Sequence, residues 1–152
     1  MRQSPNLAWQ MLIAVEFEPP LAIAEGAPLT RRLLHVRSGT FEGPALRGEI
    51  VAGGDWVLAR GDDSAELDIR FTLKTVEGEL LYMRSIGLFV AGDAVVARIR
   101  AGADVAPEHY YFRTAILLET GSARLRHLNH ILHVGVGQRT ATGMVTDVFA
   151  VA

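Results

Sequence analysis

The sequence predicts an all-β fold, either a sandwich or a closed barrel, of about eight to ten short strands. Its clearest pattern is a strict alternation from Leu67 to Lys74, in which Leu67, Ile69, Phe71 and Leu73 share one face. Such a period of two residues is typical of a half-buried strand. No stretch keeps an apolar period of 3.6 residues over three helical turns, so no long amphipathic helix is indicated.

A glycine-rich stretch from Ser38 to Trp56 is the third observation, and the rest of the chain is organised around it. Glycines within strands mark bulges and sharply curved positions. We therefore expect a bend, a curved strand and a tight turn at Gly53-Gly54. The side chain of Asp55 should close that turn by accepting hydrogen bonds from nearby backbone amides, and Trp56 should open the next strand.

Further strands are expected between residues that break a sheet. Pro19 and Pro20 cannot donate to a β ladder and should end the first strand. The polar run from Gln138 to Gly143 is interpreted as the turn before the last strand. In chain order these strands are Leu7 to Phe17, Leu21 to Ala24, Arg32 to Arg37, Trp56 to Arg60, Leu80 to Phe89, Ala94 to Arg100, His109 to Thr120, Leu125 to Gly137 and Met144 to Val151.

The composition is that of one ordinary globular domain over residues 1–152. The 15 basic and 17 acidic residues leave a net charge of −2, so the chain has no excess of positive charge that would attract nucleic acid. Cysteine is absent, which excludes disulfides and a thiol nucleophile. The chain shows neither a signal peptide nor a membrane-spanning run, so we expect a cytoplasmic protein that binds no membrane.

Short motifs in the same order along almost the whole chain resemble a bacterial and fungal family catalogued as domain of unknown function 3237. The resemblance implies a closed, antiparallel, up-and-down β-barrel of the lipocalin-like sort, with an interior able to hold a small molecule. It implies no particular reaction. The motifs are Gly39-Thr40-Phe41-Glu42-Gly43-Pro44, Leu46-Arg47-Gly48, Gly53-Gly54-Asp55-Trp56, Leu67-Asp68-Ile69-Arg70, Tyr111-Phe112-Arg113-Thr114, Glu119-Thr120-Gly121 and Leu128-Asn129.

Asp68 and Arg70 are candidate catalytic residues, because they lie two apart on one strand and their side chains leave the same face, roughly 7 Å apart. On a lumen wall, Asp68 could act as general acid or base and Arg70 could hold a carboxylate or enolate oxygen. The alternative, which the alternation alone favours, is a solvated outer face opposite the apolar inner face. The resemblance includes both residues in one motif and leaves both alternatives open.

Three more candidate catalytic residues, Tyr111, Arg113 and Glu119, share a face of the strand from His109 to Thr120. Tyr111 could donate to a developing oxyanion, although a tyrosine on a strand more often packs with its hydroxyl at the rim. Asp55 and Trp56 could line the barrel mouth, or could be a turn residue and a core residue. The full set of candidate ligand-binding residues is Asp55, Trp56, Tyr82, Arg84, His127 and Asn129.

Three histidines, His127, His130 and His133, are spaced three residues apart. On a helix they would gather, but the surrounding apolar residues favour a strand, which sends alternate side chains to opposite faces. We therefore expect no metal site and no other cofactor, while a single histidine could still act as acid or base.

Two hypotheses for the function follow. The first is a cofactor-independent acid/base enzyme, such as a cyclase, isomerase, dehydratase or hydrolase, that acts on a small, partly apolar metabolite in the barrel lumen. The alternative is a non-catalytic binder or carrier of a lipophilic small molecule. A structural or homo-oligomeric role is a third hypothesis, for which exposed apolar strand faces would be the sign.

Overall fold

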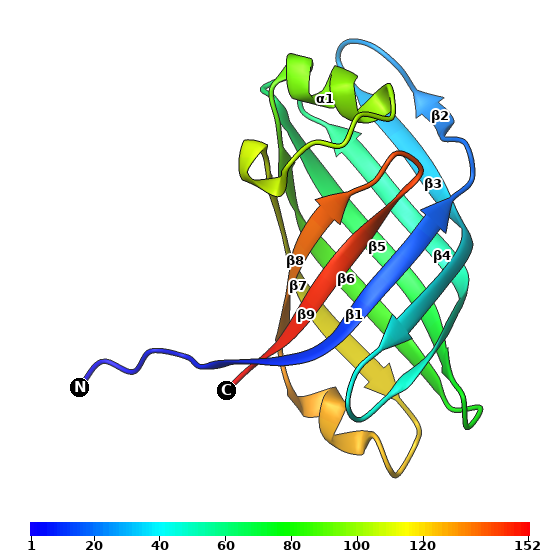
Figure 1. Cartoon of the computed structure of the whole chain (residues 1–152), viewed down its shortest axis with the longest axis vertical. Coiled ribbons are helices and arrows are strands. Elements are labelled where there is room, and N and C mark those ends of the chain that lie inside the picture. Colours follow the sequence, from blue (N-terminus) through cyan, green and yellow to red (C-terminus); the bar gives the residue numbers. More distant parts are fainter.

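The computed structural model describes residues 1–152 and shows a closed, antiparallel β-barrel with one short α-helix (Figure 1). The elements are β1 (Leu7–Phe17), β2 (Leu21–Ala24), β3 (Thr30–Glu42), β4 (Arg47–Ala59), β5 (Ser64–Thr75), β6 (Leu80–Val90), α1 (Asp93–Arg100), the 3₁₀ turn η1 (Pro107–His109), β7 (Tyr111–Thr120), the 3₁₀ turn η2 (Arg126–His130), β8 (His133–Arg139) and β9 (Gly143–Val151).

The sheet closes because β1 pairs on both sides, with β9 and with β3. Around the ring the strands follow the order β1, β9, β8, β7, β6, β5, β4 and β3, all antiparallel to their neighbours. The ninth strand, β2, pairs only with β3 and lies outside the ring. The predicted barrel is confirmed, and the sandwich alternative is excluded.

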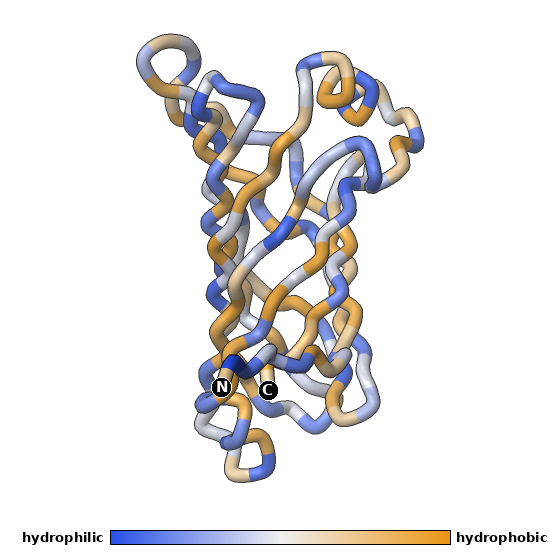
Figure 2. Tube along the Cα trace, turned by 90° about the vertical axis from the view of Figure 1, so that its left-hand side faces the viewer, coloured by the Kyte–Doolittle hydropathy of each residue, from blue (hydrophilic) through white to orange (hydrophobic).

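Side chains alternate between the lumen and the outer surface, and the strands show this as alternating apolar and polar segments (Figure 2). On β5 the predicted face made of Leu67, Ile69, Phe71 and Leu73 is buried inside the barrel. These residues belong to one apolar cluster of 21 residues that runs through the interior. An eight-stranded barrel is just wide enough for side chains to fill, so most of this interior is packed hydrocarbon.

The predicted turn at Gly53-Gly54 is wrong, because β4 runs unbroken through both glycines. The register against β5 shifts between Ile50 and Ala52, as at a β-bulge, and Gly53 has φ +120°. A Cβ atom on Gly53 would lie 2.0 Å from the Arg70 carbonyl oxygen. The glycines therefore let β4 curve tightly against its neighbours, and the chain does not reverse there.

Two predicted strand segments are helical. Ala94 to Arg100 belongs to α1, which has an acidic residue in its first turn and Arg98 and Arg100 in its last, as the helix dipole favours. At eight residues α1 is too short for a 3.6-residue pattern to stand out in the sequence, and no helix of the chain has the length and apolar character needed to cross a bilayer. The predicted strand from Leu125 begins only at His133, because η2 occupies its first half.

η2 closes the lower end of the barrel in Figure 1. Its flanking Leu125 and its central Leu128 are almost fully buried and belong to the main core cluster. Residues three apart lie on the same side of a 3₁₀ turn, so both leucines point into the barrel.

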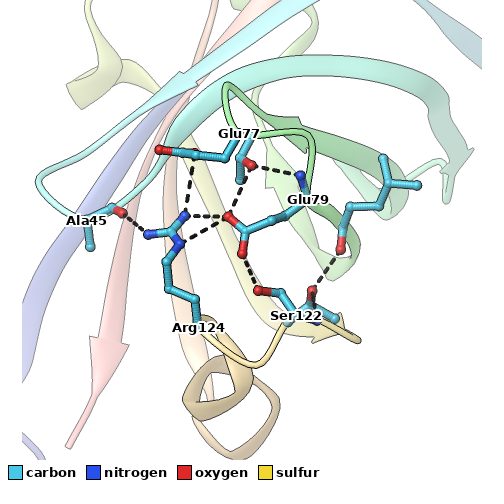
Figure 3. A network of polar contacts seen from close by, with 8 residues as sticks. Ala45, Glu77, Glu79, Ser122 and Arg124 are labelled. Atoms are coloured by element: carbon cyan, nitrogen blue, oxygen red, sulfur yellow. Dashed lines mark hydrogen bonds and ion pairs between the residues drawn. The ribbon is translucent and has the colours of Figure 1, made fainter.

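A polar network holds the same end together (Figure 3). The Arg124 guanidinium donates to Glu79 and to the Ala45 carbonyl oxygen, at 3.1 and 3.2 Å, and lies 3.6 Å from a Glu77 oxygen. The Ser122 hydroxyl donates to the other Glu79 oxygen. The network therefore joins the β5–β6 turn, the β3–β4 turn and the segment that leads into η2.

Neighbouring leucines on β7 test the inside and outside assignment. Leu118 is 3% exposed and Leu117 is 50% exposed. Leu118→Ala should lower the free energy of unfolding by about 2 to 5 kcal/mol, because it leaves a cavity in the core. Leu117→Ala should lower it by less than about 1 kcal/mol. Urea unfolding of both variants measures the difference, and equal losses would contradict the assignment.

Candidate functional site

Asp68 and Arg70 lie on the outer face of β5, so of the two alternatives the solvated outer face is correct and the lumen wall is wrong. Their side chains are 33% and 49% exposed, and the Arg70 guanidinium donates to both Asp68 carboxylate oxygens, each at 3.2 Å. The physical reason is the alternation: the apolar side chains of β5 fill the core, and an exposed ion pair avoids the desolvation cost of a buried one. Such an exposed pair contributes little to stability, because solvent screens it.

The other three candidate catalytic residues also face outwards. Tyr111, Arg113 and Glu119 are exposed on β7, and the Arg113 guanidinium lies 5.4 Å from the centre of the Tyr111 ring. Tyr82 and Arg84 lie on the outer face of the neighbouring strand β6. None of these five side chains reaches the lumen.

Three predicted residues, Tyr82, Glu119 and Asn129, do meet in an open groove outside the barrel, of about 510 Å³, beside η2. The Asn129 amide is already used there: its oxygen accepts the Thr120 N–H at 2.7 Å and its nitrogen donates to the Thr120 carbonyl at 3.0 Å. Asn129 therefore fastens η2 to the end of β7. His127 is exposed on η2, and no group of three or more His, Cys, Asp or Glu side chains gathers anywhere in the chain.

Asp55 is the one candidate that points into the lumen, whereas its neighbour Trp56 lies part-buried on the outer side of β4. One Asp55 carboxyl oxygen accepts the backbone N–H of Asp68 at 3.2 Å. The pairing of β4 with β5 is interrupted there, between Asp55 and Leu58, so the carboxyl group replaces a backbone acceptor. The predicted turn-closing role is wrong. The second carboxyl oxygen is buried without a hydrogen-bond partner.

Burial raises the pKa of Asp55 from its ordinary value of 3.8 to about 7. The charge of Arg139 and the Asp68 N–H oppose this rise, and the Asp68 carboxylate adds to it. A carboxyl group with a pKa near neutrality is well suited to exchange protons with a bound molecule.

Arg139 reaches the lumen from the opposite wall. In the ring of eight strands β8 lies four strands from β4 in either direction, so the two face each other. His133, Gly135 and Gly137 are buried on β8, and Arg139 continues the same inward-facing series at the end of the strand. The sequence interpretation missed Arg139, because it stands in a polar run that was assigned to a turn.

Further polar groups line the same interior. The Thr114 hydroxyl and both ring nitrogens of His133 are buried without a hydrogen-bond partner. A Cβ atom on Gly135 would lie 2.4 Å from the Thr114 hydroxyl oxygen, so the glycine makes room for this side chain. Burial lowers the pKa of His133, which keeps its ring neutral near pH 7. Buried polar atoms in native proteins usually have partners, so these groups mark the lumen as a candidate binding site.

The comparisons with known proteins agree with the barrel. A family model described as protein of unknown function (DUF3237) matches residues 5–151. The chain belongs to this family. A UPF0311 protein of Clostridium acetobutylicum, from the same family, is 30% identical over 122 residues, covering 78% of this chain and 77% of the relative. The family resemblance expected from the sequence motifs is confirmed.

Solved structures place family members on the same fold. The crystal structure of a conserved protein of unknown function from Rhodopseudomonas palustris has a TM-score of 0.90 and 25% identity, and the match covers all of both chains. An enzyme from Penicillium herquei has a TM-score of 0.77 and 14% identity, covering 100% of this chain and 98% of the other. At that identity the likeness concerns the fold alone.

The raised pKa of Asp55 predicts a pH dependence of stability. Folded Asp55 keeps a proton that the unfolded chain releases, so this residue's contribution to stability falls as the pH rises from 3.8 through about 7. Asp55→Asn cannot ionise and can still accept the Asp68 N–H. From about pH 5 to about pH 9 the wild type should lose roughly 3 kcal/mol more than this variant. Urea unfolding across that range measures both, and parallel curves would contradict the assignment.

Proposed function

We propose that the protein is a cofactor-independent enzyme that transfers protons to and from a small, partly apolar molecule in the barrel lumen, with Asp55 as the acid and base. The observation that carries this proposal is the free carboxyl oxygen of Asp55, fully buried in an apolar barrel. An ionised carboxylate would be disfavoured there, and burial keeps its pKa near the pH at which it can both give and accept a proton.

The surroundings suit such chemistry. Water is largely excluded from a packed barrel, so each fixed charge acts over a longer range than it does in solvent. Arg139, on the opposite wall, supplies positive charge for an oxyanion that develops during the reaction. The Thr114 hydroxyl and the neutral His133 ring are the remaining unpartnered groups that could orient a bound molecule. Isomerisation, cyclisation and dehydration need only proton transfer and charge stabilisation by such groups, whereas hydrolysis also needs a water molecule admitted to the site.

One of the structural neighbours, the Penicillium herquei protein, is an enzyme, which supports the proposal at the level of the fold. The proposal gives no role to the five candidate catalytic residues of the sequence analysis, because their side chains lie outside the lumen. They are Asp68, Arg70, Tyr111, Arg113 and Glu119.

A non-catalytic carrier of a lipophilic molecule is the second candidate function. The observation that favours it is the continuous apolar cluster of 21 residues, which makes most of the interior hydrocarbon. A carrier would release its ligand chemically unchanged and would not need Asp55 to transfer a proton.

Proton transfer can be detected before the substrate is known. Wild type and Asp55→Asn are incubated in deuterium oxide with a small-molecule extract of bacteria, and all compounds are followed by mass spectrometry. The wild type should introduce deuterium into at least one compound, or change its mass by one water. Asp55→Asn should do so at least about 100-fold more slowly, because the proton-transfer group is lost.

Glu66→Gln is the matched control, since Glu66 is an exposed carboxylate on the outer face of the neighbouring strand β5. It should keep the wild-type rate. Equal rates in wild type and Asp55→Asn would refute the role of Asp55. A compound that co-purifies unchanged with both proteins, with no exchange and no product, would establish the carrier instead.

A further inference from the structure

Arg139 is an inward-facing cation that forms no ion pair with an acidic residue of the chain. None of the five ion pairs in the structure includes Arg139, and its guanidinium donates no hydrogen bond. Its backbone N–H donates to the Tyr110 hydroxyl at 2.9 Å. Arg139 is part-buried, and a guanidinium partly removed from water normally has a carboxylate or phosphate partner, because an unpaired ion there is costly.

The charges near Arg139 do not neutralise it. Asp55 acts on it from across the lumen, but lies beyond ion-pair distance and is itself difficult to ionise. Arg100, at the end of α1, adds a second positive charge that acts on Arg139. This end of the lumen is therefore short of negative charge.

The walls beside Arg139 are aromatic. Phe89 lies 5.4 Å from the Tyr110 ring and 5.8 Å from the Phe112 ring, measured between ring centres. Gly137, two residues before Arg139, has no side chain, and a Cβ atom there would lie 2.3 Å from the Phe112 ring. The Phe112 ring thus lies against the β8 backbone at Gly137 and is almost fully buried. Phe89 and Tyr110 are part-buried, so a flat apolar body could pack against these two rings.

We propose that the lumen binds a small aromatic or lipophilic acid, whose carboxylate, or ionised phenol or enol oxygen, is held by the Arg139 guanidinium. The apolar part of the molecule lies against Phe89 and Tyr110 and extends towards Asp55. A planar guanidinium can hold a carboxylate through two parallel hydrogen bonds. This inference rests on the lumenal site of the proposed function but requires no catalysis.

Two matched probes test it. 2-Naphthoate and 2-naphthylmethanol have the same ring system, and only the first is an anion. By titration calorimetry the wild type should bind 2-naphthoate at least about tenfold more tightly, a difference of about 1.4 kcal/mol. Arg139→Gln should lose this preference while its affinity for 2-naphthylmethanol stays within about twofold. Arg139→Lys, which keeps the charge without the planar fork, should retain part of the preference.

Arg47→Gln, on the outer face of β4, is the control variant and should bind both probes as the wild type does. Retained binding of 2-naphthylmethanol shows that Arg139→Gln is folded. The proposal would be overturned if the wild type bound the two probes equally or bound neither. It would also be overturned if Arg139→Gln kept the preference for 2-naphthoate, or lost binding of both probes. If the wild type prefers 2-naphthoate but catalyses no deuterium exchange, the acid-binding proposal is supported and the proposed enzymatic function is refuted.

Discussion

Closure of the sheet is the constraint on which the other features depend. Because β1 pairs with both β3 and β9, the eight strands leave no free edge in the ring, and every second side chain must face a narrow interior. Apolar residues fill most of that interior. A polar group that points inwards is cut off from bulk water and must find its partners inside the barrel, which makes Asp55 and Arg139 exceptional.

These inward polar groups reduce the stability of the fold. Ionisation of Asp55 opposes folding, the Arg139 guanidinium lacks an ion-pair partner, and His133 and Thr114 leave hydrogen-bonding capacity unused. Replacing such groups with apolar side chains commonly stabilises a protein, often with a loss of function. That these groups occupy inward-facing positions on β4, β7 and β8 is the structural basis for treating the lumen as a site.

Much of the fold could be predicted from the sequence, because alternation reports directly which face of a strand is buried. β1 matches its predicted range, β9 begins one residue earlier than predicted, and the inner face of β5 was identified correctly. The short helical elements could not be predicted: α1 has about two turns, and in η2 the leucine spacing of three residues occurs only once. The glycine pair in β4 indicated an unusual backbone conformation. Glycines occur both where a strand curves and where the chain reverses direction, so the sequence could not distinguish the two.

The candidate site was harder to predict than the fold. Alternation alone favoured the outer face for Asp68 and Arg70, and inclusion in a shared motif was not evidence of a lumenal position. Arg139 was hidden because a strand end and a polar turn have similar composition. The importance of Asp55 depends on a gap in the β4–β5 ladder and on burial, and neither is written in the local sequence.

The position of η2 at one end of the barrel affects how a ligand would enter and leave the interior. Leu125 and Leu128 are buried in the core at that end, so a molecule in the proposed lumenal site would enter and leave at the opposite end, where α1 lies (Figure 1). Entry and exit would then share one route, so a bound product would have to leave before a new substrate could bind. For a catalyst this makes departure of the product a step that can limit the rate, and for a carrier it lets the segment around α1 control retention.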